Sequence, residues 1–305
     1  MDINARTVDN NSGRENNSGT GNNNMYKSAI CEIISDLPEQ VKAQKPLVHF
    51  ITNYVTANDC ANIVLALGGS PVMADDVQEV EDIVSISSAL VLNMGTLSKR
   101  TVDAMIVAGK RANEIGIPII FDPVGAGATR YRDETAQVII SQLKPAVIRG
   151  NLSEIKSISG LAANTKGVDV SENDALLSND LGYGKRIALE LSSRLNCVVA
   201  MTGPVDIVAY KGTAYFIENG HRMLSMVTGS GCMCTSLIGA YCGITNDYMK
   251  GAVAGVVTMG IAGEMAYERL TDGNMGTGSY RSFLIDAVYK ISKKDILEKG
   301  RVYDG

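Results

Sequence analysis

The stretch Thr228-Gly229-Ser230-Gly231-Cys232-Met233-Cys234-Thr235 has the composition of an anion-binding turn. Gly229 and Gly231 stand two positions apart, and an apolar run from Leu237 follows, which predicts a tight turn leading into a helix. Glycines lack a Cβ atom, so their backbone N–H groups can approach a ligand closely. The first turn of a helix adds N–H donors and a partial positive charge. The stretch therefore predicts a pocket for a phosphate group.

Cys232 falls in the first turn of this expected helix. The field there favours a thiolate, so we expect the pKa of the Cys232 thiol to be lowered and the side chain to be able to act as a base. The alternative is that Cys232 is a small packing residue, because a glycine-rich turn alone is a weak signal. Cys234 and Cys242 are expected to be packing residues.

A second group of polar residues stands where short apolar runs end. Its members are Asn53, Asn93, Asp122, Arg149, Asn151, Glu154 and Thr202. Asp122 and Glu154 are carboxylates, which bind Mg²⁺ together with water and phosphate oxygens. Arg149 can hold phosphate oxygens through two N–H groups. Together with the anion-binding turn, this set favours phosphoryl transfer. For Asp122 and for Glu154, capping of a helix is the alternative.

Short apolar runs must position these residues. They span residues 47–51, 71–73, 89–93, 117–121, 146–149 and 197–201. Most are followed by a polar, glycine-bearing end and a helical pattern, which predicts an α/β fold with a mostly parallel central sheet and helices on both faces. The carboxyl ends of such strands are where open α/β sheets bind ligands.

The remaining segments complete the expected organisation. A helix is predicted over residues 30–41, and a hairpin pairs 206–210 with 213–217 around Lys211-Gly212. Glycines at 251, 255, 260 and 263 indicate close packing of C-terminal helices. Residues 1–24 are rich in Asn, Ser and Gly and are expected to be disordered. Residues 25–305 show no shift in composition and are expected to form a single domain.

Composition and motifs exclude several classes of protein. The 305 residues are 45% apolar and carry a net charge of −5, which argues against nucleic-acid and membrane partners. The six cysteines show neither a disulfide layout nor a zinc pattern, so a reducing cytoplasm is the expected location. No Walker A motif occurs, and Gly125-Ala126-Gly127 lacks the third glycine of a dinucleotide fingerprint. His221 either lines a pocket or bonds locally.

An ordered series of motifs points to a family. They are Ile51-Thr52-Asn53-Tyr54-Val55, Asn58, Ala61-Asn62, Pro71-Val72-Met73-Ala74, residues 122–129, residues 149–155, Lys166-Gly167-Val168-Asp169, Met201-Thr202-Gly203, Asn219-Gly220-His221 and residues 227–233. In this order and over roughly residues 28–295, the chain resembles the hydroxyethylthiazole kinase family of thiamine biosynthesis and salvage, within the ribokinase-like superfamily. Ser230 replaces the threonine that many members have.

The resemblance implies a ribokinase-like fold and ATP- and Mg²⁺-dependent phosphorylation of the primary hydroxyl of 4-methyl-5-(2-hydroxyethyl)thiazole. It implies a homotrimer with sites at subunit boundaries. The implied roles are Cys232 as catalytic residue, Met73, Gly229, Asn53 and Thr228 at the thiazole, Arg149 and Thr202 at ATP, and Asp122 and Glu154 at the metal. A related kinase for hydroxymethylpyrimidine or its phosphate is the runner-up, and a catalytically silent thiazole- or nucleotide-binding protein is the alternative from another class.

Overall fold

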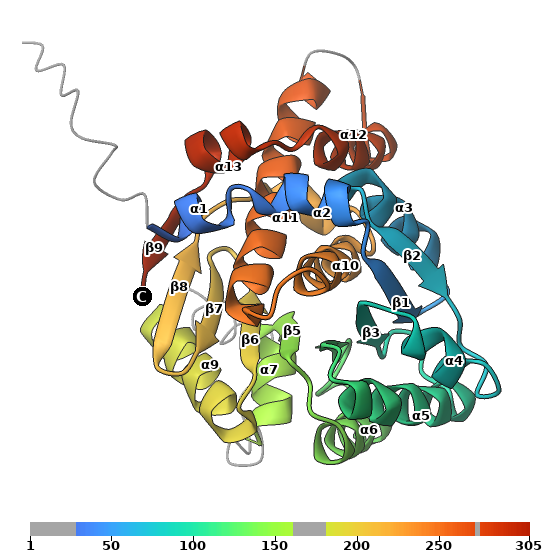
Figure 1. The fold of residues 1–305 in the computed structure, drawn as a ribbon. Helices are drawn as coiled ribbons and strands as arrows, with labels where there is room; N and C mark the ends of the chain where they lie inside the picture. The colour runs from blue at the N-terminus through green and yellow to red at the C-terminus, as the bar shows by residue number, and fades with distance from the viewer. Residues whose placement is uncertain (1–28, 161–180, 272–274) are drawn as a thin grey trace, which may run out of the picture.

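The computed structural model describes residues 29–160, 181–271 and 275–305 (Figure 1). The expected disordered tail and the motif Lys166-Gly167-Val168-Asp169 lie outside these residues. None of the described helices combines the length and the apolar composition that a membrane crossing requires.

A nine-stranded sheet runs through the described part of the chain, in the order β2-β1-β3-β4-β5-β6-β7-β8-β9. The strands are β1 Leu47–Ile51, β2 Ser70–Met73, β3 Ala89–Asn93, β4 Ile119–Asp122, β5 Val147–Asn151, β6 Val198–Thr202, β7 Asp206–Tyr210, β8 Thr213–Ile217 and β9 Val302–Asp304. Strands β1 to β6 are parallel, and β7, β8 and β9 extend the sheet with antiparallel pairing. The predicted hairpin of β7 and β8 is confirmed.

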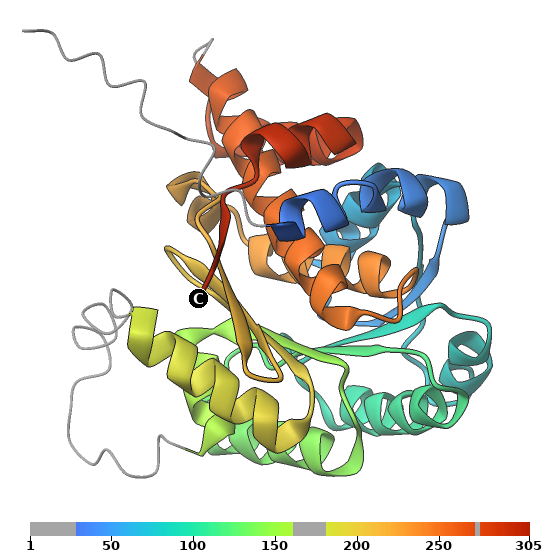
Figure 2. The same ribbon diagram turned by 60° about the vertical axis from the view of Figure 1, so that its left-hand side comes forward.

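Helices cover both faces of the sheet (Figures 1 and 2). They are α1 Ala29–Ile34, α2 Leu37–Gln44, α3 Ala57–Leu67, α4 Val80–Ser85, α5 Lys99–Ile115, α6 Arg130–Gln142, α7 Leu152–Ser159, α9 Leu181–Leu195, α10 Ser230–Cys242, α11 Tyr248–Thr271, α12 Thr277–Lys290 and α13 Lys293–Lys299, with a short 3₁₀ helix η2 at Arg222–Met226. One face carries α4 to α7 and α9, and the other carries α10 and α11 with the N- and C-terminal helices.

Alternation along the strands fills two hydrophobic cores. In β3, Leu90 and Leu92 enter the core under α5, α6, α7 and α9, whereas Ala89 and Val91 enter the core under α10 and α11. All four side chains are buried, because successive residues of a strand point to opposite faces and both faces are covered. The predicted α/β fold with helices on both faces is therefore confirmed.

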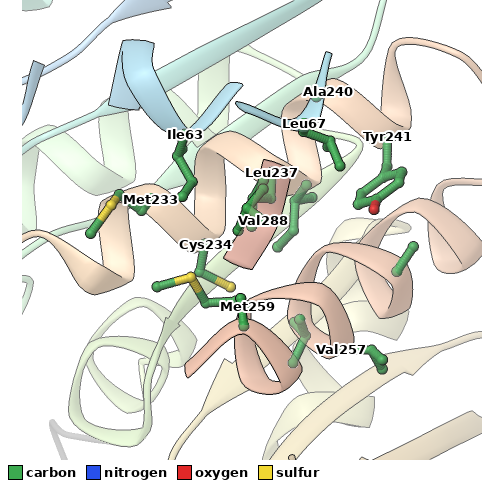
Figure 3. Close-up of a cluster of buried hydrophobic side chains, with 14 of the residues drawn as sticks. Ile63, Leu67, Met233, Cys234, Leu237, Ala240, Tyr241, Val257, Met259 and Val288 are labelled. Atoms are coloured by element: carbon green, nitrogen blue, oxygen red, sulfur yellow. The ribbon is translucent and has the colours of Figure 1, made fainter. Parts of the chain in front are cut away.

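Helix α10 lies in the middle of the second core. Met233, Leu237 and Tyr241 project from it into a cluster with side chains of α3, α11 and α12 (Figure 3). Gly255 lets α11 approach closely, since an added Cβ atom there would lie 2.5 Å from Ile238 Cγ1. The close helix packing predicted from the glycines is thus present, and it fixes the first turn of α10 over the sheet.

One predicted element is wrong. The helix expected over residues 30–41 is two helices, α1 and α2, with a break at Ser35 and Asp36. Pro38 explains the break: it has no N–H group, and its ring clashes with the carbonyl of the residue four positions earlier, Ile34, in a continuous helix. Pro38 is instead placed in the first turn of α2, where its missing donor costs little.

Candidate active site

The carboxyl ends of five parallel strands meet at one edge of the sheet. Asn93 of β3 stands opposite Asp122 of β4, and Asn151 of β5 stands opposite Thr202 of β6. Asn53 follows β1 by two residues. Because these strands are neighbours in the sheet, residues far apart in the chain come together here. The start of α10 brings Cys232 and Thr235 into hydrogen-bonding contact with them.

Two glycines at the start of α10, Gly229 and Gly231, stand where a side chain would collide with a neighbouring residue. Gly229 is the N-cap residue with φ of 85°, and an added Cβ atom would lie 2.6 Å from Thr56 Cγ2. At Gly231, an added Cβ atom would lie 2.5 Å from Arg149 Nη1. The guanidinium group of Arg149 therefore packs directly against the bare first turn of α10. A cation and a helix N-terminus side by side favour an anion at this point.

Two asparagine amides join the sulfur of Cys232 to Asp122. Asn93 Nδ2 lies 3.3 Å from Cys232 Sγ and 3.2 Å from Asp122 Oδ2. Asn53 Nδ2 donates to Asn93 Oδ1 at 2.9 Å and lies 3.5 Å from Cys232 Sγ. Each amide thus has N–H groups directed at two acceptors, and the pair fixes the sulfur relative to the carboxylate.

Asp122 is fully buried among hydrogen-bond donors. Its Oδ2 accepts from Thr235 Oγ1 at 2.7 Å and lies 3.8 Å from Arg149 Nη1. Burial is the main cause that raises the pKa of the Asp122 carboxyl, Arg149 opposes it and the negative charge of Glu154 adds to it, and together these effects place the pKa at about 6. The carboxylate is therefore ionised at neutral pH but titrates well above an exposed aspartate.

The expected lowered pKa of Cys232 is wrong. Burial raises the pKa of the Cys232 thiol, and the nearby charge of Asp122 raises it further. Hydrogen bonding from Asn93 and the charge of Arg149 act in the opposite direction but do not prevail. Cys232 is accordingly a neutral thiol at rest, held between amide groups beside the anion-binding turn.

Glu154 connects the loops that follow β4 and β5. Its Oε1 accepts from the Gly125 N–H, and its Oε2 accepts from the Asn151 N–H, each at 2.8 Å. Asn151 Oδ1 in turn accepts from the Glu154 N–H, which completes a capping box at the start of α7. The capping alternative is thus realised, and Glu154 also lies close enough to Asp122 to influence its pKa.

Arg132 of α6 holds two further loops, and the sequence gives no local indication of it. Its Nη1 donates to the carbonyls of Met94 at 2.6 Å and Val124 at 2.7 Å, and its Nη2 donates to that of Gly95 at 2.6 Å. One guanidinium group therefore holds the loops that follow Asn93 and Asp122.

A pocket of about 610 Å³ opens beside this cluster. Arg149 and Thr202 lie on one side of it, and Arg149 Nη2 donates to Thr202 Oγ1 at 2.5 Å. Ser230 and Gly231 at the start of α10 line it, and Cys234 is a buried packing residue at its wall. The two residues predicted for ATP therefore share one pocket with the predicted anion-binding turn.

Met73 lies at the edge of the sheet. It ends the edge strand β2, opposite Phe50 in register, and 39% of its surface is exposed. Thr228, directly before Gly229, is exposed beside the turn.

The chemistry of the acids fits Mg²⁺. Asp122 Oδ1 is buried without a hydrogen-bond partner among the described residues, so its lone pairs can serve a cation or a bound water. The described chain holds no group of three or more His, Cys, Asp or Glu residues suited to a metal. Mg²⁺ does not require such a cage, since one or two carboxylates with phosphates and water suffice.

Thr235 is a site residue that sequence reasoning missed. Its hydroxyl bonds Asp122, and it stands one helical turn after Cys232. That spacing places both residues on the same side of α10, which is the signal that could have found it.

The fold and this site define an α/β kinase of the ribokinase-like class. A family model described as the hydroxyethylthiazole kinase family matches residues 39–294. The chain is 53% identical to hydroxyethylthiazole kinase of Ruminiclostridium cellulolyticum over 91% of this chain and 98% of the relative. It is 42% identical to that of Methanobrevibacter smithii over 90% and 98%, respectively. The chain therefore belongs to the hydroxyethylthiazole kinase family.

Solved structures agree with this assignment. The hydroxyethylthiazole kinase protein of Pyrococcus horikoshii superposes with a TM-score of 0.80 at 35% identity, covering 90% of this chain and 99% of that one. Pyridoxal kinase of Staphylococcus aureus superposes with a TM-score of 0.55 at 15% identity, covering 72% and 88%, and shows likeness of fold alone.

Proposed function

We propose that the chain transfers the γ-phosphoryl group of ATP to the primary hydroxyl of 4-methyl-5-(2-hydroxyethyl)thiazole, in thiamine biosynthesis or salvage. Membership of the family supports the reaction. One structural observation carries the assignment to particular residues: Arg149 packs against Gly231 in the first turn of α10, where Cys232 also stands, and Asp122 lies beside Arg149. A cation, a carboxylate and a neutral polar side chain beside free N–H donors suit the transfer of a phosphoryl group to an alcohol.

ATP occupies the pocket in this proposal. Arg149 and Thr202 bind its phosphates, and the first-turn N–H groups of α10 receive the group being transferred. Gly229 and Gly231 permit this approach because neither carries a Cβ atom. The thiazole lies near Asn53, Thr228 and Gly229, with its hydroxyl beside Cys232. Positioning of the two reactants supplies a large part of the rate enhancement in such a reaction.

Asp122 and Glu154 are proposed to hold Mg²⁺. Asp122 offers its unpartnered buried oxygen, while both oxygens of Glu154 already accept backbone N–H groups, so Glu154 acts through water. When bound, the ion neutralises phosphate charge and orients the phosphate oxygens. Asn93 and Thr235 keep the Asp122 carboxylate in place for this task.

Cys232 is proposed to position the acceptor hydroxyl and, after releasing its own proton to water, to take the proton of the hydroxyl as a thiolate late in the reaction. The neutral thiol already carries its proton and is not itself a base, and its raised pKa keeps the thiolate scarce before transfer begins. Phosphoryl transfer builds little negative charge on the attacking oxygen until late, so early deprotonation is not required. The two amide groups stabilise the thiolate, which becomes a neutral thiol again when it takes the proton of the hydroxyl.

Incubation of the protein with labelled ATP, Mg²⁺ and single alcohols tests the proposal. We expect labelled phosphate on the thiazole alcohol and none on hydroxymethylpyrimidine or its phosphate. Labelling of a pyrimidine in preference would replace the proposed substrate with the runner-up. Binding of ATP and thiazole without any labelled product would indicate a silent binding protein.

Assembly, domain structure and location are proposed together with the activity. Met73, Tyr54 and Val55 are exposed by 39%, 83% and 55% near the edge strand β2, an apolar surface that a second subunit would cover. A homotrimer that brings Met73 to a neighbour's site accounts for this exposure, and sedimentation of the wild type at threefold the chain mass would support it.

We further propose a single ribokinase-like domain over residues 25–305. All six cysteines are free thiols, which supports a cytoplasmic location.

A further inference from the structure

A short loop, residues 219–221, forms part of the wall of the pocket that Arg149 lines. Asn219, Gly220 and His221 line the pocket together with Leu224 and Met259. Loops at a ligand pocket are commonly mobile, and a mobile wall lowers affinity because binding must order it. This loop is instead bonded to two distant parts of the chain.

The carboxylate of Glu264 in α11 accepts hydrogen bonds from the loop. Its Oε1 accepts from the Gly220 N–H at 2.7 Å, and its two oxygens lie 3.4 and 3.5 Å from Asn219 Nδ2. Asn219 is buried, and its Nδ2 also donates to the Lys299 carbonyl at 2.9 Å. A single carboxylate thus receives N–H groups from two successive loop residues.

Arg301, just before β9, completes the arrangement from the C-terminal end. Its Nη2 and Nη1 donate to the two oxygens of Glu264 at 2.5 and 3.2 Å, a bidentate pairing. Its backbone N–H donates to Asn219 Oδ1 at 2.7 Å, and its Nη2 also donates to the Glu218 carbonyl at 2.9 Å. Arg301 lines no part of the pocket and lies beyond the residues that the family model matches.

The same face of α11 also supports His221. Tyr267 stands one turn after Glu264, and its ring stacks on that of His221 with centroids 3.6 Å apart. His221 Nδ1 accepts from the Met223 N–H at 3.2 Å, which places the proton of a neutral ring on Nε2. One turn before Glu264, Gly260 lets the loop lie flat on the helix, since an added Cβ atom would be 2.5 Å from Asn219 Cβ. His221 therefore lines the pocket and bonds locally at once.

From these contacts we propose that Glu264, paired with Arg301, is a positioning residue for nucleotide binding. It holds loop 219–221, and through that loop the ring of His221, in the shape that receives ATP. The inference rests on the proposed function, because it takes the pocket as the ATP site. It assigns to Glu264 an effect on ATP affinity and none on the thiazole or on the transfer step, since Cys232 and Asp122 contact neither residue in the described structure.

Steady-state kinetics of Glu264→Ala and Arg301→Ala test the proposal. We expect the KM for ATP to rise roughly tenfold in Glu264→Ala, the equivalent of one hydrogen bond to a charged group, and by a smaller factor in Arg301→Ala. The kcat and the KM for the thiazole should stay within about twofold of wild type. Glu264→Gln keeps an acceptor for the Gly220 N–H and should recover part of the ATP affinity.

Asp286→Ala is the matched control. Asp286 of α12 pairs at 2.7 Å with Arg269 of α11, the helix that also carries Glu264, but this ion pair faces solvent. Its KM for ATP should be unchanged. Melting temperatures and the Kd of a non-hydrolysable ATP analogue are measured for every variant. Folded variants that melt early yet bind the analogue as wild type does would overturn the proposal and leave Glu264 a purely structural residue.

Two further outcomes are separable. If Glu264→Ala does not fold, Arg301→Ala decides, and an unchanged analogue Kd there overturns the proposal. If the wild type itself neither binds the analogue nor turns over, it is the proposed function that fails, and this is seen before any variant is compared.

Discussion

Gly231 offers a test that separates stability from function. It is the second residue of α10, and an added Cβ atom would meet only the end of the Arg149 side chain, at 2.5 Å from Nη1 and 3.1 Å from Nη2. The end of a flexible side chain can give way. We therefore expect Gly231→Ala to fold, with a stability change of no more than roughly 1 kcal/mol, because alanine favours a helix over glycine.

The displaced guanidinium group is the reason to expect a functional cost. Arg149 would lose its 2.5 Å bond to Thr202 and its approach to Asp122. A hydrogen bond to a charged group contributes about 1.5–3 kcal/mol, and each 1.4 kcal/mol is tenfold. We expect kcat/KM for ATP to fall roughly 10- to 100-fold.

The assay is steady-state phosphorylation with ATP varied, alongside thermal unfolding. Gly278→Ala is the matched control, because Gly278 is also the second residue of a helix, α12, and nothing lies within 4 Å of its added Cβ atom. It should keep wild-type kinetics. A Gly231→Ala protein with kcat/KM within twofold of this control would refute the reasoning that a bare turn sets the position of Arg149.

Three further outcomes are expected. Asp122 has its usual pKa in the unfolded chain but a pKa of about 6 in the folded one, so between these pH values folding takes up a proton. The unfolding free energy of wild type relative to Asp122→Asn, measured by urea titration, should therefore fall by on the order of 3 kcal/mol as pH rises from 4 to 7. A difference that does not change with pH would contradict the raised pKa. Iodoacetamide should modify Cys232 more slowly at pH 7.5 than it modifies a free thiol, by mass spectrometry, whereas rapid modification would indicate a thiolate. Cys232→Asp should keep measurable turnover while Cys232→Ala loses kcat more than affinity, and the reverse order would remove the proton-accepting role.

The fold and the positions of many strands were predictable from the sequence. Strands β1, β3, β7 and β8 begin and end at the expected residues. Short apolar runs with polar, glycine-bearing ends have few other interpretations in an α/β chain. The grouping of Asn53, Asn93, Asp122 and Arg149 then followed, because parallel neighbours place their carboxyl ends side by side.

The charge state of the site was not predictable in the same way. The first turn of α10 does favour a thiolate, but burial and a carboxylate from β4 outweigh that local effect on Cys232. Thr235 and Asp122 stand 113 positions apart, and Arg132 reaches carbonyls 37 and 38 positions away. Such contacts depend on how elements pack, which the spacing of residues along the chain does not encode.

The amide of Asn93 has a consequence for how the site handles charge. It lies between an oxygen of Asp122 and the sulfur of Cys232, and the two N–H groups of one amide nitrogen hold both atoms close to each other. A carboxylate and a thiolate together would repel each other across this short span, and at rest only the carboxylate is ionised above pH 6. The thiol can lose its proton and become a base only once cations offset the charge of Asp122, so the order in which the reactants arrive decides when Cys232 can take a proton from the alcohol.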